Sequence, residues 1–238
     1  ARTPGNGVFK EVYEVKPANY IYYTRNGIFQ KAYWSLQSAP HTDSLNETTE
    51  KLRDLVIDSI ERQLVSDVPI CTFLSGGLDS SAITAVAAGY FSKYGKGRLH
   101  TYSIDYEDND KYFKSSSFQP DSDNKWIELM SDYFSTIHHK VTINNEDLAS
   151  SLENALEARD LPGMADIDSS LLLFCREIKK EHVVSLSGEC ADEIFGGYPW
   201  FYRKDLVNAG TFPWSVNLSE RKKVLSEELI GIIKPEEY

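Results

Sequence analysis

Residues 1–40 have the hydrophobic pattern of β-structure. Residues 7–17 alternate apolar and polar positions, which favours a strand. Residues 19–34 are rich in aromatic and β-branched side chains and contain Asn26-Gly27, a strong signal for a hairpin turn. We therefore predict a small β-hairpin region that ends in a polar linker.

Residues 41–238 instead alternate between helical and strand patterns. Apolar residues from Leu52 to Leu64 recur at helical spacing, and Pro69 ends that helix. Strands are expected at residues 70–74, 99–105, 138–143 and 183–186, helices at 82–91, 126–134, 145–158 and 167–180, and a loop at 107–124. This alternation predicts an α/β fold: a parallel, doubly wound sheet with flanking helices.

The composition, 41% hydrophobic and 26% charged, is ordinary for a globular protein. The net charge of −11 disfavours binding to nucleic acid or to an anionic membrane surface. No apolar run is long enough to span a bilayer, and the first residues lack the core of a signal peptide. The three cysteines form no CxxC pair, so we expect a cytoplasmic protein with small-molecule partners.

The stretch FLSGGLDSS, residues 73–81, joins a predicted strand to a predicted helix. Its glycines let successive N–H groups face one point, where the positive end of the helix adds to the field. Ser75, Ser80 and Ser81 can add hydroxyl donors, so we predict a phosphate or pyrophosphate site, although the Walker A Gly-Lys-Ser/Thr is absent. Asp79 would repel phosphates unless a cation lay between them, which suggests Mg²⁺. Alternatively, Asp79 only caps the helix.

A second bend, SLSGECADEIFGGYPW at residues 185–200, follows the last predicted strand. A cluster of carboxylates at a strand end is costly unless it binds a metal or titrates for a purpose. Asp192 could share a Mg²⁺ with Asp79, because ligands of such sheets bind beyond the carboxyl ends of the strands. Glu189 could orient or deprotonate an amine. The alternative is a solvated acidic first turn of a helix.

His138 and His139 resemble a metal-binding pair. Adjacent residues on a strand point to opposite faces, which makes them a poor joint ligand set. We therefore favour a structural role for both.

Together, LSGGLDSS and LSGECADEIFGGY resemble the signature pair of the asparagine synthetase family, of the ATP-pyrophosphatase or PP-loop type. The resemblance covers nearly the whole chain. It implies an adenine nucleotide alpha hydrolase-like domain over residues 41–238. Residues 1–40 look like the last strands of the family's glutaminase domain and the linker that follows them.

The resemblance also implies the roles of individual residues. Asp79 and Asp192 match the Mg²⁺ carboxylates, and Glu189 matches the glutamate of the acyl-adenylate and amine step. The positions that match ATP contacts are Leu74, Ser75, Gly76, Gly77, Asp79, Ser80, Ser81, Ile104, Ser187 and Gly188.

The implied activity is that of an ATP-dependent amide ligase. In the family, ATP and aspartate give β-aspartyl-AMP and pyrophosphate, and ammonia from glutamine hydrolysis then displaces AMP to give asparagine. Two alternatives stay open: a related ligase of the β-lactam synthetase or peptide-cyclising type, and a non-catalytic nucleotide-binding fragment. A homodimer is the protein partner to test.

Three departures from the family pattern matter. Cys190 stands where the family usually has glycine, and we interpret it as a small buried hydrophobe. The chain starts with Ala1 and has no cysteine before Cys71, so the glutaminase nucleophile has no match. It stops at Tyr238 without a match to the family's catalytic lysine, so we expect a C-terminal truncation and little activity from this chain alone.

Overall fold

The computed structural model describes residues 5–115, 121–210 and 218–236. The chain divides into two compact units, residues 1–52 and 53–238. Within the described ranges, no helix combines the length and the apolar character that crossing a membrane requires.

The first unit contains the predicted hairpin. Strands β1 (Asn19–Thr24) and β2 (Gly27–Ala32) pair in antiparallel register, and most of their side chains are exposed. Arg25 and Asn26 occupy the turn, whereas Gly27, with φ of 128°, opens the returning strand. The hairpin is thus confirmed, with its turn one residue earlier than Asn26-Gly27 suggested.

The strand expected over residues 7–17 is absent, so that prediction was wrong. The segment turns instead, with Val12 N–H donating to the Phe9 carbonyl at 3.2 Å and Glu11 at φ of 64°. Alternation alone does not make a strand, because the backbone groups of a strand need a neighbouring strand to pair with.

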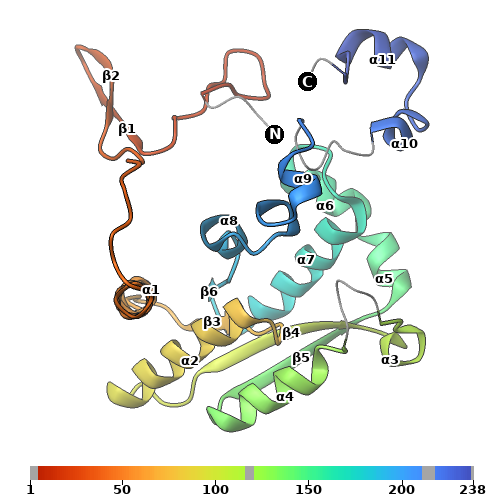
Figure 1. Ribbon diagram of the computed structural model, residues 1–238. Coiled ribbons are helices and arrows are strands. Elements are labelled where there is room, and N and C mark those ends of the chain that lie inside the picture. The colour runs from red at the N-terminus through yellow and green to blue at the C-terminus, as the bar shows by residue number, and fades with distance from the viewer. Residues whose placement is uncertain (1–4, 116–120, 211–217, 237–238) are drawn as a thin grey trace. The chain divides into compact units, whose positions relative to one another are not determined.

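The second unit is built on a four-stranded parallel sheet (Figure 1), as predicted. Its strands are β3 (Ile70–Phe73), β4 (His100–Tyr106), β5 (Ile137–Ile143) and β6 (Val184–Leu186). The order across the sheet is β5-β4-β3-β6, so β3, the first of these four strands along the chain, lies inside the sheet. The bends that follow β3 and β6 therefore leave neighbouring strands at the same edge.

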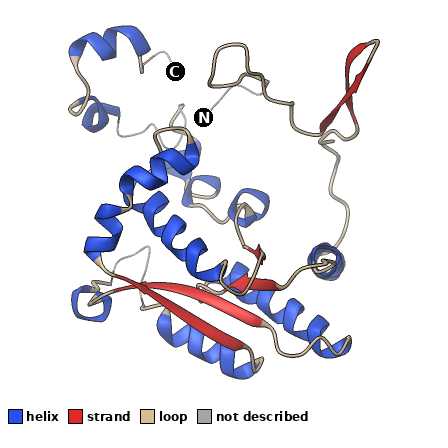
Figure 2. Ribbon diagram, turned by 180° about the vertical axis from the view of Figure 1, so that it is seen from behind, coloured by secondary structure: helices blue, strands red, loops and turns tan. Residues whose placement is uncertain are grey.

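Helices cover both faces of this sheet (Figures 1 and 2), with α2 and α4 on one face and α7 on the other. Their bounds are α2 (Leu78–Lys93), α4 (Asn124–Tyr133) and α7 (Ala165–Ile178), and α1 (Leu45–Gln63) precedes the sheet. Ile70 of β3 packs in a buried cluster with Ala87 of α2, whereas its neighbour Cys71 packs with Phe174 and Ile178 of α7. The doubly wound architecture is thereby confirmed.

Two segments depart from the predicted elements. The helix expected at 145–158 is two helices, α5 (Asn145–Ser150) and α6 (Leu152–Arg159), which meet at the buried Ser151. The loop expected at 107–124 contains α3 (Asn109–Tyr112), and its residues 116–120 lie outside the described residues. After β6 come α8 (Ala191–Phe195), the 3-10 helix η1 (Pro199–Phe201), α9 (Lys204–Val207), α10 (Leu218–Lys222) and α11 (Glu227–Ile233).

The two adjacent histidines of β5 do point to different partners, as expected for a strand. His138 Nδ1 lies 2.9 Å from Thr101 Oγ1, and its Nε2 lies 3.0 Å from Ser103 Oγ. His139 instead contacts His100 and Tyr102. Burial, together with the nearby His139 and Lys140, lowers the pKa of His138 below its ordinary value of 6.5.

We expect the protein to lose stability as the pH falls below about 6.5. At such pH values His138 is protonated in the unfolded chain but stays neutral in the folded protein, so protonation favours the unfolded state. The loss continues until the pH reaches the depressed pKa of the folded state. The melting temperature should therefore be lower at about pH 5.5 than at about pH 7.5. His138→Gln, which can keep a hydrogen bond to a neighbouring hydroxyl, should show a smaller drop, and an equal drop would contradict this origin.

Candidate active site

The two Ser-Gly bends are in direct contact at the carboxyl edge of the sheet. The first begins at Ser75, after β3, and the second at Ser187, after β6. A Cβ atom placed on Gly188 would lie 3.0 Å from Asp79 Cβ and 3.3 Å from the Ser80 backbone nitrogen. Gly188 therefore lets the second bend approach the first turn of α2 closely.

Residues from both bends line one cavity of about 270 Å³. Asp79 lines it from the first bend, and Glu189 and Asp192 line it from the second. Within the described part of the chain, none of the residues that line it is a lysine or an arginine. The cavity therefore combines backbone amides and hydroxyls with carboxylates, and it lacks a basic side chain to balance them.

The structure requires glycine at the two adjacent positions of the first bend to different degrees. Gly76 has φ of 80°, and a Cβ there would lie 2.9 Å from the Asp123 carbonyl oxygen and 3.0 Å from Trp126 Cβ. Gly77 is the N-cap of α2 in an extended conformation with φ of −72°, and a Cβ there would meet only Ser75 Oγ, at 3.4 Å. Packing against α4 thus requires Gly76, whereas Gly77 exposes its backbone.

The hydroxyl of Ser80 is occupied within the bend itself. It accepts a hydrogen bond from the Ser75 backbone N–H at 3.2 Å and lies 3.2 Å from the Gly77 carbonyl oxygen, to which it donates. Ser80 is buried, whereas Ser75 is exposed at the mouth of the bend. Ser80 therefore stabilises the shape of the bend, and a direct contact of its hydroxyl with an anion stays a prediction.

Asp79 does not cap α2 through its side chain. The N-cap residue is Gly77, which makes no side-chain cap, and Asp79 lies in the first turn of the helix. A carboxylate in the first turn is favourable to the helix dipole. Its position on the cavity wall leaves the carboxylate accessible to a ligand as well.

Asp192 rests against the backbone of the glycine pair that follows α8. A Cβ on Gly197 would lie 1.9 Å from Asp192 Oδ1, so the absence of a side chain there makes room for the carboxylate. Tyr198 also lines the cavity. Burial and the nearby carboxylates, Glu193 and Asp192 foremost, raise the pKa of Tyr198, as a negative local field would.

Cys190 is exposed and lines the same cavity, so its interpretation as a small buried hydrophobe was wrong. Its backbone is left-handed, with φ of 71°. That conformation costs a residue with a side chain about 1–2 kcal/mol and costs glycine very little. This left-handed backbone explains why the family that the sequence resembles usually has glycine at this position.

A second cavity, of about 220 Å³, adjoins the first through Phe73 and Ser75, which line both. Leu74 and Ile104, the positions matched to nucleotide-base contacts, line this second cavity. Its other apolar lining residues are Tyr102, Phe113, Ile127 and Phe174. Six polar residues, Ser103, Asp105, Asn109, Ser122, Asp123 and Asn124, complete its lining. A cavity with a mainly apolar surface thus lies next to one that carries three carboxylates, and Ser75 of the first bend lines both.

Asp105, a buried carboxylate on the wall of the second cavity, was not among the residues predicted from the sequence. Its oxygens lie 2.6 Å from Lys140 Nζ and 2.8 Å from Asn109 Nδ2. Burial alone would raise the pKa of Asp105, but these partners outweigh it and hold the pKa below the ordinary value. The same rule that selected Asp79, a polar residue at the carboxyl end of a parallel strand, could have found it.

The fold and the site together define a doubly wound α/β domain whose ligand position, beyond the carboxyl ends of the strands, is formed by two Ser-Gly bends in contact. Residues 51–237 match the asparagine synthase family, and the chain belongs to that family.

The chain is similar to two curated asparagine synthetases of the glutamine-hydrolysing type. It is 58% identical to asparagine synthetase 3 of Bacillus subtilis over 238 residues, which is all of this chain and 38% of that protein. It is 29% identical to the enzyme of Asparagus officinalis over 208 residues, 81% of this chain and 32% of that protein. The chain thus spans well under half the length of either relative.

A solved NAD⁺ synthetase from Burkholderia pseudomallei aligns with 64% of this chain and 66% of its own, at 13% identity and a TM-score of 0.38.

Proposed function

We propose that this chain is the ATP-binding part of an amide ligase that makes asparagine from aspartate through a β-aspartyl-AMP intermediate. One observation carries the proposal: both bends and their carboxylates line a single cavity, and that cavity adjoins an apolar pocket. ATP needs this combination, because its base is apolar and planar whereas its phosphates need hydrogen-bond donors and a counter-charge.

The adenine base would lie in the apolar cavity against Leu74 and Ile104. The phosphates would lie on the first bend, where the N-terminus of the 16-residue helix α2 adds a positive field. Gly77 offers exposed backbone there. Ser187 and Gly188 would close the site from the second bend.

The donor set of the polar cavity fits Mg²⁺. Three carboxylates, on Asp79, Glu189 and Asp192, line it without a basic side chain among the described lining residues. Phosphates would be repelled there unless a cation lay between, and carboxylate oxygens are the ligands that Mg²⁺ prefers. We assign Asp79 and Asp192 to hold the ion, which when bound neutralises charge on the leaving pyrophosphate.

The chemistry then needs positioning more than covalent participation. The aspartate carboxylate attacks the α-phosphorus, pyrophosphate leaves, and ammonia displaces AMP from the acyl-adenylate with loss of a proton. The amides of the first bend stabilise the developing negative charge. Glu189, exposed on the cavity wall, is placed to orient the amine and to accept that proton.

Binding without turnover is the second candidate for this chain by itself. The observation that favours it is that no described residue lining the polar cavity is a lysine or an arginine. The cavity offers carboxylates and amides that can hold Mg-ATP, yet it offers no cationic side chain to stabilise the transition state. The choice between aspartate and the carboxylates used by β-lactam or peptide-cyclising ligases also stays open.

We extend the proposal to the organisation of the chain. Residues 1–40 would be the end of a glutaminase domain and its linker, and residues 41–238 the ATP-pyrophosphatase domain. The exposure of nearly every side chain in β1 and β2 supports an origin in a larger sheet. The three free cysteines support a cytoplasmic location, and a homodimer stays a prediction.

The test compares this chain with a longer protein that contains it. We expect both to bind Mg-ATP in a calorimetric titration, and we expect the longer protein to release pyrophosphate and AMP from ATP, aspartate and ammonia. Other carboxylates in place of aspartate distinguish the related ligases. Release of ADP and phosphate, or no binding of ATP by either protein, would overturn the proposal.

A further inference from the structure

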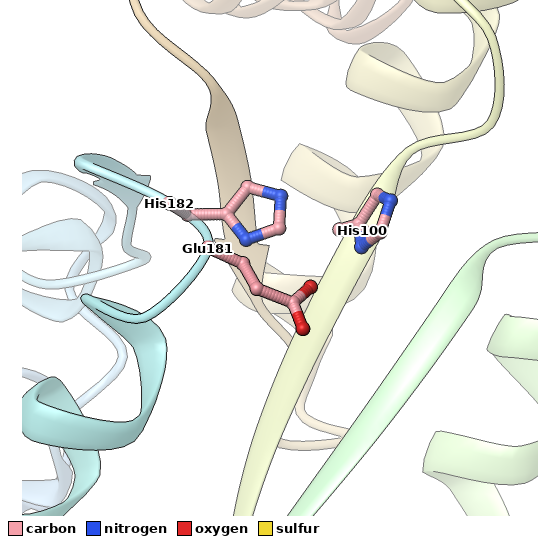
Figure 3. Close-up of side chains that lie close together, drawn as sticks. All are labelled: His100, Glu181 and His182. Atoms are coloured by element: carbon pink, nitrogen blue, oxygen red, sulfur yellow. The ribbon is translucent and has the colours of Figure 1, made fainter.

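A cluster of histidines lies at the amino edge of the sheet, away from the candidate active site. His100 begins β4, and Glu181 and His182 lie in the connection from α7 to β6. One ligand atom from each of these three residues lies within 4.8 Å of the other two. Figure 3 shows the two rings and the carboxylate gathered around one point.

The hydrogen bonds of the two rings favour a ligand role. His100 Nδ1 lies 2.9 Å from His139 Nε2, and His182 Nδ1 lies 2.9 Å from the Tyr102 hydroxyl. When each Nδ1–H donates in these bonds, each Nε2 presents a lone pair. A metal-bound histidine usually donates its other N–H in this way, which fixes the ring and its tautomer.

The burial of the cluster is graded. His182 is buried, His100 is partly buried, and Glu181 is exposed. A cavity of about 270 Å³ reaches both His100 and His182, and Lys96 and Arg98 also line it. The exposed Glu181 carboxylate therefore has to supply the negative charge that attracts a cation to the two rings.

Aromatic packing explains only part of this cluster. His139 stacks on Tyr102 with ring centroids 4.4 Å apart, and His100 stacks on His139 at 5.1 Å. Those contacts account for rings in a core. They leave the Glu181 carboxylate, which lies beside the two rings and is exposed to solvent, free to share a cation with them.

We propose that His100, Glu181 and His182 bind one transition-metal dication, with Zn²⁺ as the best match. Two imidazole nitrogens and one carboxylate oxygen, with water in a fourth position, form a common zinc ligand set. Tetrahedral zinc keeps its ligand atoms about 3.4 Å apart, so a pair at the full 4.8 Å has to close by roughly 1.4 Å when the ion binds. Imidazole ligands disfavour Mg²⁺ and Ca²⁺ here. The ion would tie the connection before β6 to the start of β4.

The experiment titrates Zn²⁺ into the full chain after its two exposed cysteines, Cys175 and Cys190, have been alkylated, and repeats the titration with Co²⁺. We expect one equivalent to bind, with the visible spectrum of four-coordinate cobalt. Because the ion binds only the folded chain, a zinc concentration of 100 times Kd should raise the melting temperature by about 5–10 °C.

Two variants and two controls locate the site. Glu181→Gln, on the surface, and His100→Asn should each weaken binding at least about 10-fold. Glu177→Gln, an exposed glutamate of α7, and Asp192→Asn, in the candidate active site, should leave it unchanged. The proposal fails if no equivalent binds, if Glu181→Gln binds normally, or if only Asp192→Asn loses the ion.

Discussion

Gly76→Ala should lower the free energy of unfolding by about 2–4 kcal/mol. The left-handed backbone at Gly76, with φ of 80°, contributes about 1–2 kcal/mol of this cost for any residue with a Cβ. The rest comes from contact of that Cβ with the Asp123 carbonyl and Trp126 Cβ, which are fixed parts of α4 and its entry. Urea unfolding followed by circular dichroism measures the change.

Gly77→Ala is the matched control for this prediction. Its backbone is extended, and an added Cβ would meet only Ser75 Oγ at ordinary contact distance. Because glycine is a clearly better N-cap than alanine, this variant should cost about 0.5–1 kcal/mol, well below the cost at Gly76. Equal losses for the two variants would show that the bend is not anchored on α4 as the structure describes.

The sheet and its two bends could be predicted from sequence because local signals agreed with the global fold. Ile70 and Cys71 belong to a short, continuous apolar run, which is the pattern expected of a strand buried on both faces. The Ser-Gly pairs at Ser75 and Ser187 mark where the chain leaves such strands. The rule for the carboxyl edge then placed both bends together, and the contact at Gly188 bears this out.

The different roles of the individual residues in the first bend could not be predicted from the sequence. The sequence shows two adjacent glycines and several serines, but only the approach of α4 distinguishes Gly76 from Gly77. Likewise, only the closed shape of the bend shows that the Ser80 hydroxyl is occupied. Contacts between elements distant in sequence decide both points.

The wrong predictions share a physical origin. The alternation at residues 7–17 was a local pattern with no neighbouring strand to pair with, and pairing is what makes a strand. Cys190 was judged by its residue type, whereas its left-handed backbone and its position in the second bend expose it. Asp105 is a different case, because the rule for the carboxyl edge could have selected it, whereas its ion pair with Lys140 on the next strand could not be predicted from the sequence.

Asp79→Asn and Asp192→Asn should each weaken the binding of Mg-ATP by about 1–3 kcal/mol, roughly 5- to 150-fold. The two losses should not add in the double variant. If both carboxylates hold one ion, removing the first already removes much of what the second contributes. The double variant should therefore lose about 1 kcal/mol less binding free energy than the sum of the two single losses. Asp132→Asn, an exposed position in α4, is the control and should change nothing.

The affinity for ATP, measured with and without Mg²⁺, shows whether these aspartates hold the metal or only stabilise the shape of the bends. Without Mg²⁺, each carboxylate lies beside the proposed phosphate position as an uncompensated negative charge, in a cavity whose described lining has no basic side chain. In the absence of Mg²⁺, replacing either aspartate by asparagine should therefore leave the affinity for free ATP unchanged or raise it. If the aspartates only shaped the bends, Asp79→Asn would weaken ATP binding equally with and without the metal. Parallel titrations in Mg²⁺ and in EDTA therefore distinguish the two explanations, because only the structural one predicts weaker binding of ATP by Asp79→Asn in EDTA.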